Sequence, residues 1–161
     1  MSIKVGDKVP AGSFGIMGSA GPGAMSTDEL FGGKKVVLFG VPGAFTPTCS
    51  NTHLPGFVQN AEALKAKNID TVACLSVNDI FVMDAWGKSS GVGGNVVMLA
   101  DGNAEYTKAL GLELDASGFG MGTRSQRFAM VIEDGVVRKL MVEPSAGECT
   151  ISGGSSVLES L

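Results

Sequence analysis

Two short apolar runs of the sequence set the strongest limit on how this chain can fold. One extends from Val36 to Gly40, directly after the lysine pair 34–35, and the other is TVACLSV at 71–77. A run without polar alternation is typical of a strand that is buried on both faces. The segment between the two runs has helical periodicity, so we predict a strand–helix–strand unit at the centre of the fold.

Helices and strands continue to alternate along the chain, which closes with a hairpin and a last helix. We predict a helix over about 50–67 that Pro55 kinks or restarts, a helix capped by Asn78 and Asp79, a strand over 96–99, a helix over 106–110, strands over 128–132 and 136–142, and a C-terminal helix with a capping box at Ser156 and Glu159. Asp134 and Gly135 predict a type I′ hairpin between the last two strands. This order indicates an α/β fold with a central mixed β-sheet flanked by helices, the layout of a thioredoxin-like fold.

Length and charge narrow the class of protein further. A chain of 161 residues without repeats or a long linker predicts one domain over 1–161. The net charge of −4 and the pI near 4.9 argue against nucleic acid or an anionic membrane surface as a partner. No apolar run approaches the roughly 20 residues of a membrane span, and the N-terminal residues carry no signal or transit pattern. We expect a cytoplasmic protein, with mitochondrial or peroxisomal locations as alternatives.

Three cysteines, Cys49, Cys74 and Cys149, cannot all pair within one molecule. They form no C-x-x-C motif, and the chain has a single histidine, His53, so a zinc site lacks both ligands and spacing. We therefore predict no metal. A reducing compartment with one or more working thiols fits this pattern better than a secreted disulfide framework.

Cys49 stands where one element ends and the next begins. It follows the buried strand and the turn VPGAFTPT at 41–48, and it opens the predicted helix. The free N–H groups and the positive end of a helix would then face its sulfur. Such a position lowers the pKa of a thiol and favours the thiolate, which is the nucleophilic form. The placement indicates a reactive cysteine.

The octapeptide PGAFTPTC, from Pro42 to Cys49, matches the P-x-x-x-T-x-x-C signature of the peroxiredoxins, thiol peroxidases of thioredoxin-like fold. The chain resembles their atypical two-cysteine branch, type 5 or type II, over 40–57, over 72–79, and from Arg127 to the C-terminal helix. This resemblance implies a peroxidase without a cofactor that reduces hydrogen peroxide and alkyl hydroperoxides, with peroxynitrite as a further candidate. It also implies thioredoxin as the reductant and favours a homodimer.

The resemblance implies a role for each residue around the sulfur. Cys49 would be the peroxidatic thiolate, and the Thr46 hydroxyl would accept a proton from the peroxide and donate to the thiolate. Arg127 would favour the thiolate and steady the charge that grows on the peroxide oxygens. Pro42 would pack over the sulfur and limit water. For Arg124 two interpretations stay open: it holds a carboxylate near the site, or it is solvated.

His53 and a glycine-rich segment have competing interpretations. His53 lies four residues after Cys49, which suggests a Cys–His hydrolase pair, but a histidine at this spacing points along the helix, so we interpret it as a pocket or orienting residue. GFGMG at 118–122 does not follow a buried strand, which argues against a nucleotide loop. We expect a mobile loop beside the site, with Phe119 or Met121 offering apolar surface to organic hydroperoxides.

A sulfenic acid on Cys49 needs a second thiol, and the sequence offers two. Cys149 lies in a Gly/Ser-rich segment that resembles the loop where animal type 5 enzymes keep their resolving cysteine, about two residues earlier than usual. Cys74 has the pattern of a core residue, although plant type II relatives place their second cysteine there. We favour an intramolecular disulfide with Cys149 and keep Cys74 and an external thiol as alternatives. A disulfide needs Cα atoms within about 7 Å, so the first turn of the Cys49 helix must unwind. A redox-sensing module with little turnover is the alternative function.

Overall fold

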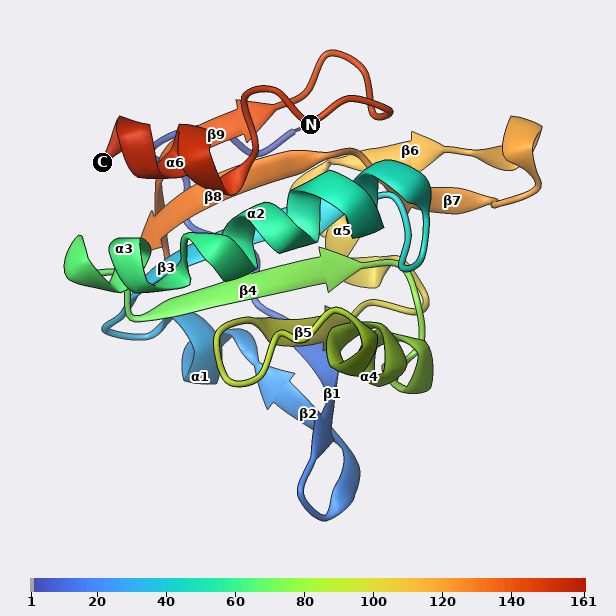
Figure 1. The fold of residues 1–161 in the computed structure, drawn as a ribbon, viewed down its shortest axis with the longest axis horizontal. Coiled ribbons are helices and arrows are strands. Elements are labelled where there is room, and N and C mark those ends of the chain that lie inside the picture. Colours follow the sequence, from blue (N-terminus) through green and yellow to red (C-terminus); the bar gives the residue numbers. More distant parts are fainter. Residues whose placement is uncertain (1) are drawn as a thin grey trace.

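The computed structural model describes residues 2–161 and has a seven-stranded mixed sheet as its framework (Figure 1). Its strand order is β2-β1-β5-β4-β3-β8-β9. The central strands β3, β4 and β5 are parallel, while β8 and β9 on one side and β1 and β2 on the other are antiparallel additions. The strands are β1 (Ser13–Gly18), β2 (Gly21–Ser26), β3 (Lys35–Val41), β4 (Thr71–Ser76), β5 (Val97–Ala100), β8 (Phe128–Glu133) and β9 (Val136–Val142).

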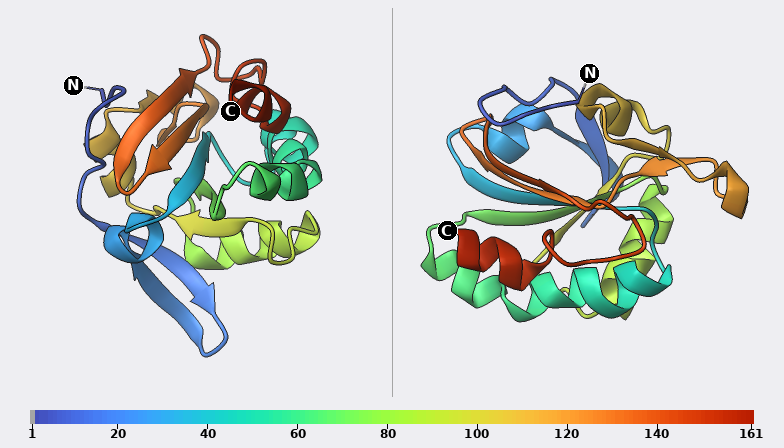
Figure 2. Two further views of the ribbon diagram at one scale, coloured as in Figure 1. Left: turned by 90° about the vertical axis from the view of Figure 1, so that its left-hand side faces the viewer. Right: turned by 90° about the horizontal axis from the view of Figure 1, so that it is seen from above.

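Helices cover both faces of this sheet (Figure 2). One face carries α2 (Leu54–Gln59), α3 (Ala61–Ala66), α4 (Ile80–Ser89) and α6 (Gly154–Ser160), and the opposite face carries α1 (Thr27–Phe31) and α5 (Glu105–Leu110). Among residues 2–161, no helix is long and apolar enough to cross a membrane. The arrangement is the thioredoxin-like α/β fold that the sequence predicts.

The apolar run at 36–40 is the central strand β3, and it is buried on both faces as expected. Val37, Phe39 and Val41 point into the core that α2 and α4 cover, whereas Val36 and Leu38 point into the core beneath α1 and α5. Because a strand with two buried faces has no solvent side, its sequence shows no polar alternation.

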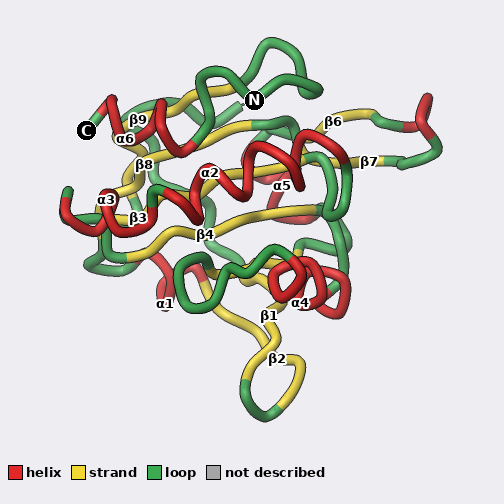
Figure 3. Tube along the Cα trace, viewed as in Figure 1, coloured by secondary structure: helices red, strands yellow, loops and turns green. Residues whose placement is uncertain are grey.

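Two hairpins project from the body of the molecule (Figure 3). The β1–β2 hairpin has no counterpart in the sequence prediction, because its glycine-rich segment 13–26 shows only weak alternation. The second is the small sheet of β6 (Glu113–Asp115) and β7 (Thr123–Ser125), which flanks a 3₁₀ turn at Ser117–Phe119. The hairpin at Asp134 and Gly135 is confirmed as type I′ in character, since both residues have positive φ values, 47° and 78°.

The predicted capping box at Ser156 and Glu159 is wrong. Helix α6 begins earlier, after Gly153, and no side chain caps it. Because Ser156 lies inside the first turn, its hydroxyl donates to the Thr150 carbonyl at 2.7 Å. A capping box does exist at Ser26 and Glu29, before α1, where each side chain bonds the other's backbone N–H at 3.1 Å.

Candidate active site

Cys49 sits in the first helical turn after β3. The chain leaves β3 at Val41, and Phe45 in the connecting turn takes a left-handed conformation, φ 63°. Helical backbone begins at Pro47, a position where the missing N–H costs nothing, so Cys49 lies two residues inside the helix. Its sulfur belongs to a fully buried residue, at 0% exposure.

Residues Cys49–His53 form a π-helical turn that leads into α2. The N–H of Leu54 donates to the carbonyl of Cys49, five residues back, where an α-helix would have a four-residue step. Pro55 explains this wider turn, because it has no N–H for the carbonyl four residues before it and its ring crowds that carbonyl. The helix therefore restarts at α2, as the sequence predicts, and the π turn falls on the reactive residue.

Arg127 brings a buried positive charge to the sulfur. It precedes β8 and is only 2% exposed. Its Nη2 donates to Cys49 Sγ at 3.1 Å, its Nη1 to His53 Nδ1 at 3.0 Å, and its Nε to the Ala146 carbonyl at 2.9 Å. The fork of the guanidinium is thus fixed at three points, and a fixed cation beside a thiol favours the thiolate.

His53 orients this arginine. The ring lies beside Phe39 and Phe57 and is fully buried. Its Nε2 lies 2.9 Å from the Ser152 carbonyl, which can only accept, so the proton resides on Nε2 and the bare Nδ1 accepts from Arg127. Burial, and then the Arg127 charge, lower the pKa of His53 to about 3, so the ring is neutral.

The same hydrogen bonds argue against the interpretation of Cys49 and His53 as a hydrolase pair. Both ring nitrogens of His53 are engaged, one by Ser152 and one by Arg127, so neither is free to take a proton from Cys49. A Cys–His pair requires the imidazole as general base to the thiol. The structure supports the orienting role that the sequence suggests.

Acidification is expected to destabilise the fold through His53. An unfolded chain protonates this residue near its ordinary pKa of 6.5 while the folded chain does so only near about 3, so the unfolded state binds more protons between these values. Stability therefore falls as the pH drops through 6.5, by about 1 kcal/mol between about pH 7.5 and about pH 5.5. Urea unfolding at a series of pH values, under reducing conditions, measures this change in the free energy of unfolding. Because His53 is the only histidine, His53→Gln should remove most of the dependence, and an unchanged slope would contradict the assignment.

Thr46 and Pro42 lie in the turn that leads to Cys49. The Thr46 hydroxyl donates to the Gly43 carbonyl at 2.6 Å, so it does not donate to the sulfur here, and its oxygen lone pairs stay free to accept a proton. Pro42 is half-buried at the end of β3. Its packing over the sulfur stays a prediction, as does proton acceptance by Thr46.

Arg124 has a different role from either one expected. Its Nε donates to the Met121 carbonyl at 2.9 Å and its Nη1 to the Val77 carbonyl at 3.2 Å, so it neither holds a carboxylate nor stands free in solvent. It ties the 118–122 loop to the end of β4. Met121 and Arg124 also pack against Gly43, where an added Cβ would lie 3.4 and 3.1 Å from them, whereas Phe119 is 85% exposed.

The two other thiols occupy contrasting places. Cys74 is fully buried in β4, in the same core cluster as Cys49, and burial raises the pKa of Cys74 well above its usual range. Cys149 is half-buried in the segment between β9 and α6, and burial raises the pKa of Cys149 as well. Three bonds tie this segment to the active-site residues: Thr48 Oγ1 donates to the Gly147 carbonyl at 2.8 Å, and Arg127 and His53 bind the carbonyls of Ala146 and Ser152.

Glu143 is the site residue that sequence reasoning missed. It directly follows β9 and is only 5% exposed, and its backbone N–H donates to the Arg127 carbonyl at 2.9 Å. The sequence carries two weak signals: Glu143 is an acid directly after a predicted strand, and Pro144 follows it. Neither reveals that its carboxylate faces a loop about eight residues further on.

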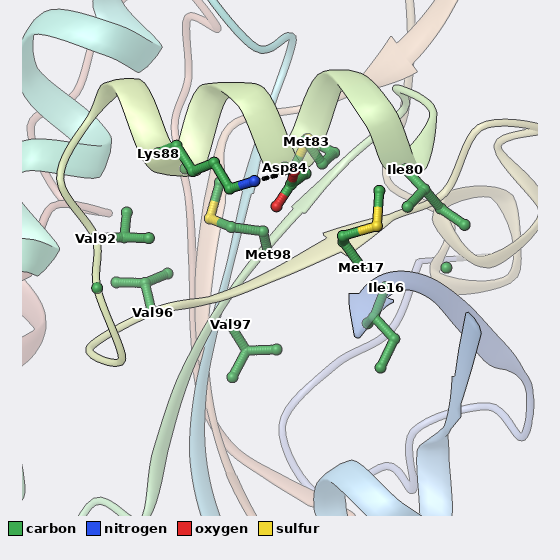
Figure 4. A pocket seen from close by; sticks show the side chains of 13 residues that line it. Ile16, Met17, Ile80, Met83, Asp84, Lys88, Val92, Val96, Val97 and Met98 are labelled. Atoms are coloured by element: carbon green, nitrogen blue, oxygen red, sulfur yellow. Dashed lines mark ion pairs between the residues drawn. The ribbon is translucent and has the colours of Figure 1, made fainter. Parts of the chain in front are cut away.

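A separate groove of about 340 Å³ lies between α4, β1 and β5 (Figure 4). The residues that line the groove are mainly apolar. Lys88 and Asp84 also line it and form an ion pair, with 2.9 Å between Nζ and Oδ2. None of the sequence-predicted site residues line it. The groove is therefore distinct from the surroundings of Cys49.

A buried thiol that a fixed arginine contacts, at the start of a helix on a thioredoxin-like sheet, defines a thiol-based redox protein. The Redoxin family matches residues 4–158 of the chain. Peroxiredoxin-2B of Arabidopsis thaliana is 49% identical over 160 residues, 99% of this chain and 98% of that protein. Crystal structures of reduced Prx3 from Vibrio vulnificus in complex with hydrogen peroxide (49% identity, TM-score 0.93, 98% of each chain) and of peroxiredoxin 5 from Alvinella pompejana (37% identity, TM-score 0.85, 98% and 97% of the chains) share the fold.

The chain belongs to the peroxiredoxins, in the type II branch that also includes the type 5 proteins. It is therefore a thiol peroxidase. These matches confirm the family, the fold class and the enzyme class that the signature around Cys49 predicts.

Proposed function

We propose that this peroxiredoxin reduces hydrogen peroxide and alkyl hydroperoxides through Cys49, forms an intramolecular disulfide with Cys149, and is recycled by thioredoxin. The observation that carries the proposal is the 3.1 Å hydrogen bond from Arg127 to the Cys49 sulfur. Peroxynitrite is a further candidate substrate. The crystal structure of the Vibrio vulnificus relative with hydrogen peroxide supports the choice of peroxide as substrate.

The chemistry proceeds in three balanced steps. The Cys49 thiolate attacks one peroxide oxygen, and an S–O bond forms as the O–O bond breaks. The other oxygen leaves as water or an alcohol when it takes up one proton, which balances the proton that the thiol lost on ionisation. The Thr46 hydroxyl oxygen can accept a hydrogen bond from the O–H of the peroxide, which orients the attacked oxygen, and Arg127 offers positive charge to the oxygens. Cys149, deprotonated to its thiolate, then attacks the sulfenic sulfur; an S–S bond forms, the S–O bond breaks, and the hydroxide that leaves combines with the proton lost by Cys149 to give water. A thioredoxin dithiol finally reduces the disulfide and is itself oxidised.

The accessibility of the thiols supports Cys149 over Cys74 as the resolving residue. Cys149 is half-buried in an irregular segment, whereas Cys74 is fixed inside the sheet between β3 and β5. Movement of Cys149 disturbs side-chain hydrogen bonds of an irregular loop, such as those to the carbonyls of Ala146 and Gly147, but movement of Cys74 breaks two strand ladders. The π turn at Cys49 supports local unwinding, since such turns are less regular than the α-helix around them.

A redox map tests this assignment directly. Reduced protein receives one equivalent of hydrogen peroxide, is alkylated under denaturing conditions, and is digested without reductant for mass spectrometry. We expect a Cys49–Cys149 peptide within seconds, from a band that runs as a monomer on a non-reducing gel. A Cys49–Cys74 link, or a persistent Cys49 sulfenic acid, would contradict Cys149 as the resolving thiol. If Cys49 stays reduced for minutes in folded protein, its peroxidatic role is wrong.

A peroxide-sensing module with little turnover is the second candidate, since the Cys49 site would oxidise in either case. Consumption of peroxide in the presence of thioredoxin and its reductase distinguishes the two: many turnovers per chain support the enzyme, and one turnover supports the sensor. The homodimer, the cytoplasmic, mitochondrial or peroxisomal location, and the single domain over 1–161 stay predictions.

A further inference from the structure

The Glu143 carboxylate collects five hydrogen bonds from one turn of the chain. Oε2 accepts from the backbone N–H groups of Thr150, Ile151 and Ser152 at 2.9, 2.8 and 2.7 Å, and from the Ser152 hydroxyl at 2.6 Å. Oε1 accepts from the Thr150 hydroxyl at 2.8 Å. Three successive N–H groups that converge on one anion hold the backbone of that turn in a single conformation.

This anion is held as a charge although it is buried. Burial alone would raise the pKa of Glu143, but the hydrogen bonds from Ser152 and Thr150 outweigh burial, so that the pKa lies below its ordinary value. A buried carboxylate with all its bonds made rigidifies its surroundings, whereas a partly satisfied one is costly. The 150–152 turn is therefore bound firmly to the end of β9.

The turn that Glu143 holds also presents a carbonyl to the active site. Ser152 donates to Glu143 with its N–H and its hydroxyl, while its carbonyl accepts from His53 Nε2 at 2.9 Å. That bond fixes the tautomer of His53, whose Nδ1 receives Arg127 Nη1 at 3.0 Å. Arg127 in turn donates to Cys49. A continuous chain of hydrogen bonds thus connects the carboxylate to the sulfur.

We propose that Glu143 is a positioning residue for the Cys49 thiolate. By fixing the 150–152 turn it aims the Ser152 carbonyl at His53, and His53 keeps the arginine fork directed at the sulfur. The carboxylate touches neither the peroxide nor the sulfur and acts only through these neighbours. The inference rests on the proposed role of Arg127 beside Cys49.

Positioning and long-range charge predict opposite effects when the carboxylate is neutralised. Removal of a negative charge near Arg127 by itself favours an ionised thiol, which would move the ionisation of Cys49 to lower pH. If the 150–152 turn is no longer fixed, His53 and Arg127 instead move away from Cys49. Loss of the positive charge beside the sulfur would then move the ionisation of Cys49 to higher pH. The direction of the change therefore separates the two explanations.

Glu143→Gln is the decisive variant, because it leaves the N–H groups of Thr150, Ile151 and Ser152 with a neutral acceptor, and hydrogen bonds to a neutral oxygen are weaker than those to a carboxylate. We expect the midpoint of the pH profile of Cys49 alkylation by iodoacetamide to rise by about one pH unit and the reaction with hydrogen peroxide to slow about tenfold. Mass spectrometry of the Cys49 peptide follows the alkylation. Glu148→Gln removes the same charge from an exposed position of the same segment and should leave both values unchanged.

The outcomes are distinguishable from one another. An unchanged or lowered midpoint in folded Glu143→Gln, or an equal shift in Glu148→Gln, would overturn the positioning role. Thr150→Val removes only the hydroxyl bond to Oε1, so it should slow the peroxide reaction about threefold even if Glu143→Gln does not fold, and wild-type behaviour would count against the proposal. If Arg127→Gln changes neither the midpoint nor the rate, the role of Arg127 itself fails. If it changes both while Glu143→Gln changes neither, only the Glu143 inference fails.

Discussion

Replacing Arg127 by glutamine is expected to slow the reaction of Cys49 with hydrogen peroxide by about 100- to 1000-fold. The variant removes the charge beside the sulfur, which we propose stabilises the peroxide oxygens, and it also loses the bonds to His53 and Ala146. Arg127→Lys should recover little of the rate, because an ammonium group cannot contact Cys49, His53 and Ala146 together.

Stopped-flow fluorescence of Trp86 measures this rate, since the only tryptophan donates from its indole to Ser50, next to Cys49, at 3.0 Å. Arg138→Gln is the matched control, because Arg138 is exposed on β9 and forms an ion pair with Glu133 at 3.9 Å. We expect wild-type rates from this control. A rate within about threefold of wild type for Arg127→Gln would remove Arg127 from the mechanism.

Replacing Cys149 by serine is expected to separate the two halves of the catalytic cycle. The first oxidation of Cys49 should keep its rate, because the structure gives the Cys149 side chain no hydrogen bond to Cys49, Arg127 or His53 among residues 2–161. Steady-state turnover with thioredoxin should fall by about 100-fold or more, since the sulfenic acid then waits for an external thiol.

The turnover assay couples thioredoxin and its reductase to the oxidation of NADPH, with single-turnover oxidation of the same samples beside it. Cys74→Ala serves as the control, because it removes the competing thiol and leaves Cys149 in place. Its turnover should match that of wild type. Full thioredoxin-dependent turnover in Cys149→Ser would assign the resolving step to Cys74 or to an external thiol.

Much of this protein could be predicted from local sequence. The run at 36–40 predicts a doubly buried strand because every side chain in it is apolar, and Pro55 predicts a restarted helix because a ring without an N–H cannot continue one. The signature that ends at Cys49 predicts the family. These features depend on neighbours within a few positions along the chain, which is why the sequence reveals them.

Other features depend on groups of another segment that a side chain meets only after the chain has folded back. The five bonds of Glu143 need the chain to return after β9, and the His53 tautomer is set by the carbonyl of Ser152, 99 residues away. The Arg124 side chain donates to the carbonyls of Met121 and Val77, which lie in two separate loops. Backbone N–H and carbonyl groups occur at nearly every position and carry no residue-specific signal, so a residue pattern could not have shown these backbone contacts.

The order of the active-site residues along the chain determines when Cys49 becomes reactive during synthesis. The cysteine lies in the first third of the chain, but Arg127, Glu143 and Ser152 all follow it by at least 78 residues. A ribosome-bound chain that ends before Arg127 therefore holds Cys49 without the guanidinium that contacts its sulfur. We expect such a nascent chain to react with oxidants no faster than an ordinary thiol, so that it acquires its reactivity only when the C-terminal segment docks.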